Sequence, residues 1–102
     1  MDEFGRIERR LSLHDLRVLM VVVQAGSMGK AAKLLATSQP AVSRSIGELE
    51  QALGVRLLDR SAQGIEPTPF GHALLKRGAA VFDELLHGIK DIRFLSDPTT
   101  GE

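Results

Sequence analysis

The segment covering residues 31–44, AAKLLATSQPAVSR, constrains the fold of this 102-residue chain more than any other. Ala31 and Ala32 are small enough to let two helices approach closely. Ser38 is a favoured residue at a helix N-cap, and Pro40 suits a first helical turn because its missing N–H leaves no hydrogen bond unmade there. The segment therefore predicts two short helices joined by a tight turn, a helix-turn-helix.

The second of these helices is predicted over about residues 39–53, and its two faces differ in character. The apolar residues at helical spacing, which indicate a core-facing side, are Val42, Ile46, Leu49 and Leu53. The other side carries the small or hydrogen-bonding residues Gln39, Ser43, Arg44 and Gly47. Such a face is usually just solvated, but inside a helix-turn-helix it can contact base edges or phosphates.

Two further helices are expected before the turn segment. Ser12 is expected to cap the first helix, which ends at Ala25-Gly26 and has the core-facing stripe Leu16, Leu19, Met20 and Val23. Ser27 is expected to cap the second, with Ala31, Leu34 and Leu35 facing inward. Residues 1–11 are charged and show no clear period, so we expect a flexible arm there, frayed or loosely helical.

A two-stranded hairpin is predicted after Gly54, which is a permissive helix end. Val55, Leu57 and Leu58 are followed by the polar turn 61–64 and then by residues 65–67. Gly64 supplies the turn position that needs a positive φ. Residues 12–68 are therefore predicted to form a mainly α fold, a winged helix-turn-helix with three helices plus a two-stranded wing.

A long helix is predicted over residues 69–95, because Thr68 is a good cap and Pro69 suits a first helical position. Its length to residue 93 would be about 37 Å, which is too long for a small domain to cover. The apolar stripe along it contains Leu74, Gly78, Val81, Leu85, Ile89 and Ile92. This stripe could pack within one chain, but we expect it to form a homodimer with the same helix of a second chain. Residues 96–102 are interpreted as a hinge or tail.

Several linked motifs resemble the N-terminal domain of LysR-type transcriptional regulators across about residues 12–95. They are Ser27-Met28-Gly29-Lys30-Ala31-Ala32, Ser38-Gln39-Pro40-Ala41-Val42-Ser43, Leu49-Glu50, Leu53 to Arg60, and Pro67 to Gly71. Two apolar residues, Met28 and Leu58, replace aromatic residues that many members carry, at positions expected to be buried. The resemblance implies a homodimeric regulator of transcription that binds double-stranded DNA at an inverted-repeat site.

The resemblance also implies which residues contact DNA. The positions matching Gln39, Pro40, Ser43 and Arg44 meet the major groove in the family, and the wing position matching Arg60 approaches the neighbouring minor groove. Glutamine can bond adenine, arginine can bond guanine or a phosphate, and Pro40 and Ala41 can contact a thymine methyl. Ser38 at the helix N-terminus and Lys30 are candidates for phosphate contacts. Arg60 could instead pair with Asp59 or Glu66.

Charge and composition limit the remaining classes of function. The net charge is zero, and residues 12–68 carry six basic against five acidic residues, so we expect few phosphate contacts per subunit and an affinity that depends on two subunits. There is no cysteine and the three histidines are scattered, so no metal site is expected. No catalytic constellation is visible, hence no enzyme is predicted. Without a long apolar run or signal peptide, we expect a cytoplasmic protein and no membrane contact.

Family members normally carry a C-terminal domain that binds a small-molecule effector. No such domain and no cofactor is expected in this chain, which we interpret as a fragment or a naturally short relative; its tail favours the fragment. Two alternatives stay open. One is a dimerisation or protein-interaction module that has lost DNA affinity, consistent with the zero net charge. The other is a winged helix from a different regulator group, such as molybdate-responsive regulators.

Overall fold

The computed structural model describes residues 3–97, so residues 1–2 of the predicted arm and residues 98–102 of the predicted tail lie outside the described residues. In chain order the elements are α1 (Glu3–Arg10), α2 (Leu13–Ala25), α3 (Met28–Leu34), α4 (Gln39–Leu53), β1 (Leu58–Ser61), β2 (Gly64–Pro67) and α5 (Pro69–Ser96). The fold is mainly α, with a long last helix. The predicted winged helix-turn-helix is therefore confirmed.

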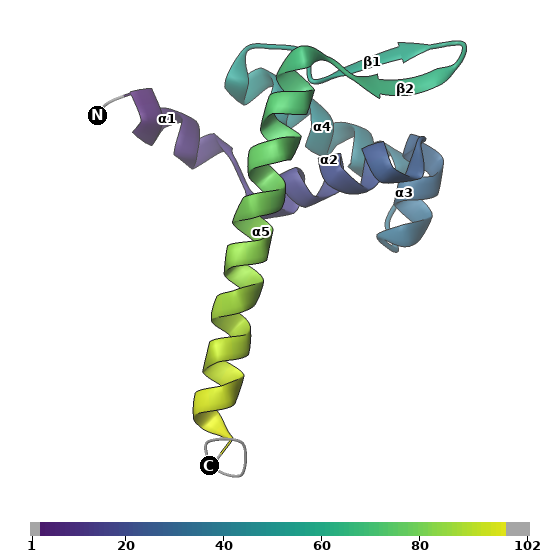
Figure 1. Cartoon of the computed structure of the whole chain (residues 1–102). Coiled ribbons are helices and arrows are strands. Elements are labelled where there is room, and N and C mark those ends of the chain that lie inside the picture. The colour runs from purple at the N-terminus through teal and green to yellow at the C-terminus, as the bar shows by residue number, and fades with distance from the viewer. Residues whose placement is uncertain (1–2, 98–102) are drawn as a thin grey trace.

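The helices α2, α3 and α4 and the β1–β2 hairpin form a body at one end of α5 (Figure 1). Helix α2 lies at the centre of this body, since it contacts α3, α4, α5 and β2. Helix α5 runs past the body and continues well beyond it, while α1 extends from the body on the side opposite to the hairpin (Figure 1). Residues 83–96 are all exposed, so the second half of α5 is left without cover from its own chain.

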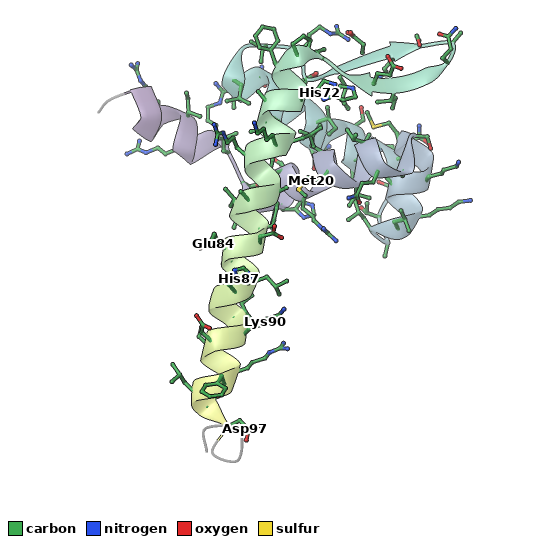
Figure 2. The ribbon with its side chains drawn as sticks, viewed as in Figure 1. Met20, His72, Glu84, His87, Lys90 and Asp97 are labelled. Atoms are coloured by element: carbon green, nitrogen blue, oxygen red, sulfur yellow. The ribbon has the colours of Figure 1, made fainter. Side chains whose placement is uncertain are left out.

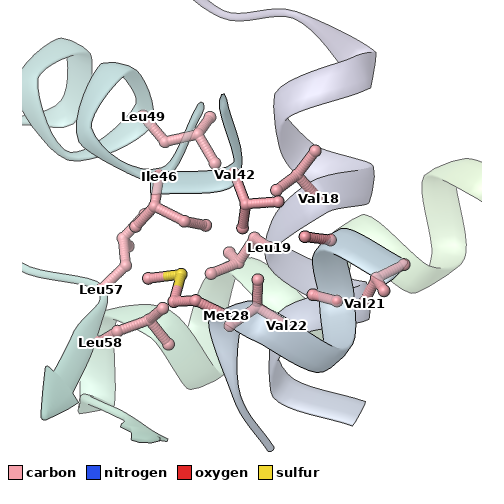
Figure 3. Close-up of a cluster of buried hydrophobic side chains, with 12 residues drawn as sticks. Val18, Leu19, Val21, Val22, Met28, Val42, Ile46, Leu49, Leu57 and Leu58 are labelled. Carbon is pink, nitrogen blue, oxygen red and sulfur yellow. The ribbon is translucent and has the colours of Figure 1, made fainter. Parts of the chain in front are cut away.

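The hydrophobic core joins all three helices of the body to the wing (Figure 3). Its largest fully buried side chains are Leu19, Leu49, Leu57, Val18, Val22 and Val42. Burying one side chain of this size stabilises the fold by about 1.5 to 3 kcal/mol. Met28 and Leu58, which replace aromatic residues, are buried as expected, at 6% and 2% exposure.

The predicted stripe on α2 is only partly correct. Leu19 is buried, but Leu16, Met20 and Val23 are half-buried, and the other buried positions are Val18, Val21 and Val22. Helix α2 contacts neighbouring elements on several sides, and its buried apolar residues are therefore distributed around the helix instead of along one face. A single-face pattern cannot predict this arrangement.

Leu34 on α3 was expected to face inward and is 72% exposed instead. Met28, Ala31 and Ala32 set the buried face of this seven-residue helix, and Leu35 continues it. Leu34 lies roughly a third of a turn away from the centre of that face. The adjacent leucine, Leu35, therefore packs against the core in its place.

Helix α1 is regular where a frayed or loosely helical arm is the expectation from sequence. Leu11 N–H donates to the Ile7 carbonyl oxygen at 3.0 Å, and Leu11 packs against the core. Helix α1 also contacts α4. The many charged residues of this segment hide its short apolar spacing, which is why the sequence pattern does not predict the helix.

Each predicted cap makes its hydrogen bond. The Ser12 and Ser27 hydroxyl oxygens accept from the N–H groups of Asp15 and Lys30, both at 3.0 Å. The Ser38 hydroxyl accepts from Ala41 N–H at 3.2 Å. A cap of this kind stabilises a helix by about 1 kcal/mol. At the other ends, Gly26 and Gly54 have φ of 82° and 73°, the left-handed conformation that glycine adopts without strain.

Residues 56–58 join α4 to the wing and to α5; we call them the junction segment. The Glu50 carboxylate on α4 accepts from Leu57 N–H at 2.8 Å and from Leu58 N–H at 3.3 Å. Thr68, at the start of α5, donates from its N–H to the Leu57 carbonyl at 2.9 Å and from its hydroxyl to the Arg56 carbonyl at 2.6 Å. The junction segment is thus bonded to both long helices.

The wing is an antiparallel hairpin whose register runs from Leu58 opposite Pro67 to Ser61 opposite Gly64. Gly64 has a φ of 118°, which confirms its predicted role in the turn. Ser61 stabilises the tip, because its hydroxyl accepts from Gln63 N–H at 3.2 Å and donates to Gln63 Oε1 at 3.1 Å. Leu58 buries the base of the wing, while the tip projects from the body (Figure 1).

We predict that Gly71→Ala destabilises the fold. Gly71 lies in the first turn of α5, and an alanine Cβ there would overlap the Leu57 carbonyl oxygen of the junction segment. Overpacking against backbone should lower the free energy of unfolding by about 1 to 3 kcal/mol, measured by urea denaturation at one fixed protein concentration.

The control is Gly47→Ala on α4, where an added Cβ meets nothing within 4 Å. Alanine has the higher helix propensity, so this variant should gain about 0.5 to 1 kcal/mol. Equal effects of the two substitutions would contradict the close approach of α5 to the junction segment.

We also predict that Glu50→Ala lowers the free energy of unfolding by about 1 to 3 kcal/mol, because it leaves the Leu57 N–H without an acceptor in a part-buried position. Glu48→Ala on the exposed side of the same helix removes an equal charge and should change stability by less than about 0.5 kcal/mol. The two variants are compared by urea denaturation. A loss as small for Glu50 as for Glu48 would show that the carboxylate is not what holds the junction segment.

Candidate nucleic-acid interface

Helix α4 presents one face to the core and the opposite face to solvent. Val42, Ile46 and Leu49 are buried at 1–2% exposure. Gln39, Pro40, Arg44 and Gly47 are exposed, whereas Ala41 and Ser43 are half-buried at the edges of the open face. The predicted polar face therefore exists, and its exposed members extend from Gln39 at the start of the helix to Gly47.

The first turn of α4 leaves a backbone donor open. Val42 N–H donates to the Ser38 carbonyl at 3.2 Å, and Ala41 N–H donates to the Ser38 hydroxyl. Pro40 has no N–H, so within the part of the chain that the structure describes only Gln39 N–H at the helix start remains open. An open donor at the positive end of a helix dipole favours an anion such as a phosphate.

The turn between α3 and α4 is short and closely packed. Ala31 and Ala32 are buried at 0% and 5% exposure, which confirms the close approach expected of small residues. Thr37 N–H donates to the Ala32 carbonyl at 2.9 Å. Ala36 takes a φ of 54°, a left-handed conformation that costs a non-glycine residue about 1 kcal/mol. The turn is therefore held in one geometry despite local strain.

Gln39 lies beside the first turn of α3. A Cβ atom added at Gly29 would be 3.5 Å from Gln39 Oε1, which is ordinary contact distance. Gly29 and the Gln39 side chain therefore lie next to each other where the two helices meet. Lys30, one residue further along α3, is exposed, as is Lys33.

The wing carries opposite charges on its two faces. Arg60 lies opposite Ile65, whereas Asp59 lies opposite Glu66, and side chains alternate between faces along a strand. Arg60 is exposed, and among the side chains that the structure describes it makes no ion pair with Asp59 or Glu66. The basic face of the wing is therefore free to meet an external anion.

The eight predicted contact residues come from α3, the start of α4 and the wing. Helix α3 and the wing lie on the same side of α5 (Figure 1). The cations on these elements are Lys30, Lys33, Arg44 and Arg60, all of them exposed. Residues 12–68 also contain five acidic residues. One of these, Glu50, is hydrogen-bonded to the junction segment and so makes its hydrogen bonds away from this surface.

Glu50 and Gly71 have roles that sequence reasoning missed. Glu50 follows the buried Leu49, and both residues belong to a motif of the resemblance, so a signal was present. Its function depends on backbone donors seven and eight residues away, which a periodic pattern cannot identify. In the sequence Gly71 is an ordinary helix glycine, because its close approach to the Leu57 carbonyl is a tertiary contact that no local pattern shows.

The stripe predicted for dimerisation is divided between two environments. Leu74 is half-buried against the core, and Gly78 is buried, with an added Cβ 3.1 Å from Leu16 Cδ1. The four remaining members are 41% to 65% exposed: Val81, Leu85, Ile89 and Ile92. Val81 lies at the edge of the body, since it lines an apolar pocket with Leu16 and Leu49. The other three lie on the part of α5 that extends beyond the body, where Figure 2 labels Glu84, His87 and Lys90. Two more leucines on this part, Leu86 and Leu95, are exposed at 48% and 82%.

Comparisons with known proteins agree with this architecture. Residues 13–72 match the family model for bacterial regulatory helix-turn-helix proteins of the lysR family. The HTH-type transcriptional regulator YybE of Bacillus subtilis is 44% identical over 87 residues, which are 85% of this chain and 30% of YybE. TdcA of Escherichia coli is 37% identical over 85% of this chain and 28% of TdcA.

Two solved structures of DBD–DNA complexes superpose on the chain. A complex of the CbnR DBD with DNA has a TM-score of 0.78 at 36% identity and covers 85% of this chain and 100% of that one. The BenM DBD in complex with catB site 1 DNA has a TM-score of 0.81 at 30% identity, over 85% and 98%. No helix in the described part of the chain is long and apolar enough to cross a membrane.

The chain spans about 30% of the length of these curated relatives. Within that span, the helix-turn-helix, the wing and the long last helix all agree with the family model and with the solved structures. The chain belongs to the lysR family of bacterial regulatory helix-turn-helix proteins.

Proposed function

We propose that this chain binds duplex DNA sequence-specifically as a homodimer and thereby regulates transcription. The observation that carries the proposal is the exposed face of α4, which presents Gln39, Pro40 and Arg44 while the opposite face of the helix is fixed in the core. A helix held in this way can enter a major groove and offer side chains to base edges. The similar CbnR and BenM structures are complexes with DNA, which supports the same partner here.

The contact residues would have different tasks. Gln39 and Arg44 would contact bases, since both side chains can form paired hydrogen bonds with one base. Ser38 and the open Gln39 N–H would lie near a phosphate, as would Lys30. Arg60, on the basic face of the wing, would approach the neighbouring minor groove. Ala41 and Ser43 are half-buried and would contribute contacts from the edge of the face.

The homodimer would form through the uncovered half of α5. Leu85, Ile89 and Ile92 lie on this half and Val81 lies just before it, and a second copy offers an equally apolar surface. The 28 residues of α5 make it about 42 Å long, enough to keep two bodies apart by the roughly 34 Å that separates successive major grooves on one side of a duplex. A two-fold dimer would then bind an inverted-repeat site. A regulator of this kind acts on the chromosome, so we place it in the cytoplasm.

The proposal is tested by selecting bound duplexes from a random-sequence pool at near-physiological salt. We expect an inverted repeat to be enriched. On that site Arg44→Ala should weaken binding by about 1 to 3 kcal/mol and relax the preference at one position of each half-site. Affinities are measured by fluorescence anisotropy at several salt concentrations.

Lys90→Ala is the control, because it removes one positive charge from a part of α5 that lies beyond the body (Figure 2). It should leave affinity nearly unchanged. Equal binding by the Arg44 variant and the parent would contradict the assignment of α4 as the reading helix. A folded dimer that enriches no sequence would favour the alternative function, a protein-interaction module without DNA affinity.

Dimerisation is tested with Leu85→Asp, which places a charge in the uncovered apolar surface of α5. Light scattering should show a monomer at concentrations where the parent is a dimer, since burying an unpaired carboxylate costs several kcal/mol. Ala80→Asp introduces the same charge and a similar loss of helix propensity on the opposite, exposed side of α5. That control should stay dimeric. A dimeric Leu85 variant would mean that α5 is not the interface.

A further inference from the structure

An open groove lies where the end of α4 and the junction segment meet the first turns of α5. Its volume is about 370 Å³. The apolar side chains that line it come from all three of these elements and are Leu53, Val55, Leu57, Phe70, Ala73 and Leu74. Among the lining residues only Arg77, on α5, is charged. We call this site the junction groove.

Phe70 is the most exposed large side chain of the junction groove. Its exposed fraction is 57%, in a chain that contains only four phenylalanines and no tryptophan or tyrosine. It lies in the first turn of α5 beside Gly71, which lets that turn approach the Leu57 carbonyl closely. The fold therefore holds Phe70 in place while leaving its ring uncovered. An apolar group presented in this way is typical of a surface that contacts another protein.

Arg77 brings a positive charge to this apolar surface. Its guanidinium makes no ion pair with any carboxylate in the described part of the chain. The residues one turn away on either side of it, Ala73 and Val81, are apolar. Arg56, between the lining residues Val55 and Leu57, is a second exposed cation without an ion pair among the described side chains. The junction groove is thus apolar with an unneutralised positive edge.

The junction groove is distant from the two surfaces that the proposed function uses. Leu53 lies 14 residues beyond Gln39, which is about 21 Å along α4. Phe70 lies 15 residues before Leu85, which is about 22 Å along α5. An occupant of the groove can therefore be bound at the same time as DNA and a second copy of the chain.

We propose that the junction groove is a docking site for a second protein, which places a large apolar side chain on Phe70 and a neighbouring carboxylate on Arg77. A guanidinium pairs with a carboxylate through two parallel hydrogen bonds, and the pair is stronger beside an apolar surface that partly excludes water. Arginine and phenylalanine are both enriched at interfaces between proteins. This inference goes beyond the proposed function and does not depend on it.

The shape and charge of the groove select this class of partner. A small molecule is usually enclosed on most of its surface, which a groove edged by an exposed phenylalanine does not allow. A nucleic-acid backbone requires a row of cations, whereas this groove has Arg77 in its lining and Arg56 beside it. A protein helix with an apolar residue and an acidic residue one turn apart can contact both the apolar lining and the cation.

The proposal is tested with two fluorescein-labelled amphipathic peptides that share a leucine face. One peptide carries glutamate on its polar face, and the other carries lysine at the same positions. We expect the chain to bind the acidic peptide at least about tenfold more tightly than the basic peptide, measured by fluorescence anisotropy. In heteronuclear NMR spectra the acidic peptide should shift the amide signals of Val55, Ala73 and Arg77 most. Absence of binding, equal binding of both peptides, or shifts confined to the exposed face of α4 would overturn the proposal.

An exchange of charge tests the role of Arg77. Arg77→Glu should reverse the preference, so that the basic peptide binds more tightly than the acidic one. The control is Lys76→Glu, which makes the same change of charge at the adjacent exposed residue, about 100° around α5 and outside the groove lining. This control should bind the acidic peptide within about threefold of the parent. Equal effects of the two variants would show attraction by overall charge and contradict a specific site.

A second pair of variants tests the apolar part of the groove. Phe70→Ser should weaken binding of the acidic peptide by about tenfold or more, because a large apolar contact is lost. Phe94→Ser, which replaces a phenylalanine of similar exposure (50%) near the other end of α5, should change it by less than about threefold. Circular dichroism checks that both variants are folded, and equal changes would contradict a role for Phe70.

Light scattering distinguishes the proposed partner from a second copy of the chain. If Phe70→Ser converts a dimeric parent to a monomer, the groove is an interface between copies and the proposal is wrong. None of these outcomes bears on the selection of duplexes, so failure of this inference and failure of the proposed function are seen in separate experiments.

Discussion

The relative placement of α4, the wing and α5 depends on the hydrogen bonds of the junction segment, residues 56–58. The Glu50 carboxylate bonds its N–H groups from α4, and Thr68 bonds its carbonyls from α5. Hydrogen bonds to a charged group contribute about 1.5 to 3 kcal/mol, more than neutral ones. Gly71 lets α5 approach the same backbone without overlap. Helix α4, the wing and α5, which would contact different partners, are thereby joined at the junction segment.

This connection gives a physical route from the dimer to DNA. In the proposed dimer, pairing of α5 fixes the two bodies relative to one another, and the junction segment fixes α4 and the wing relative to α5. The spacing of two reading helices is then set by rigid elements and not by a flexible linker. Positioning on rigid elements matters because base contacts require side chains to be held close to their productive geometry.

Local signals predicted the parts of the fold that local chemistry determines. Ser38 caps α4 and Gly64 closes the hairpin because each needs only its near neighbours. The helix-turn-helix, the wing and the long helix followed from such signals. The orientation of Leu34 did not, since it depends on which face Met28 and Ala32 bury. Glu50 was missed for a similar reason: its partners are backbone groups of the junction segment, and a side-chain pattern contains no information about them.

In the candidate site, too, local patterns predicted some features while others depended on contacts between elements. Exposure of Gln39 and Arg44 followed from the helical period. Which acidic residues share a face of the wing with Arg60 depended instead on strand register, which the sequence pattern does not give. The 13 basic residues of the chain are balanced by 13 acidic ones, and the cations on α3, α4 and the wing that one copy can offer a phosphate backbone are few: Lys30, Lys33, Arg44 and Arg60. Because contacts from two linked subunits act together at one site, a dimer can reach an affinity that a single body with few cations does not. The apolar surface of α5 is thus as necessary for DNA binding, in this proposal, as the polar face of α4.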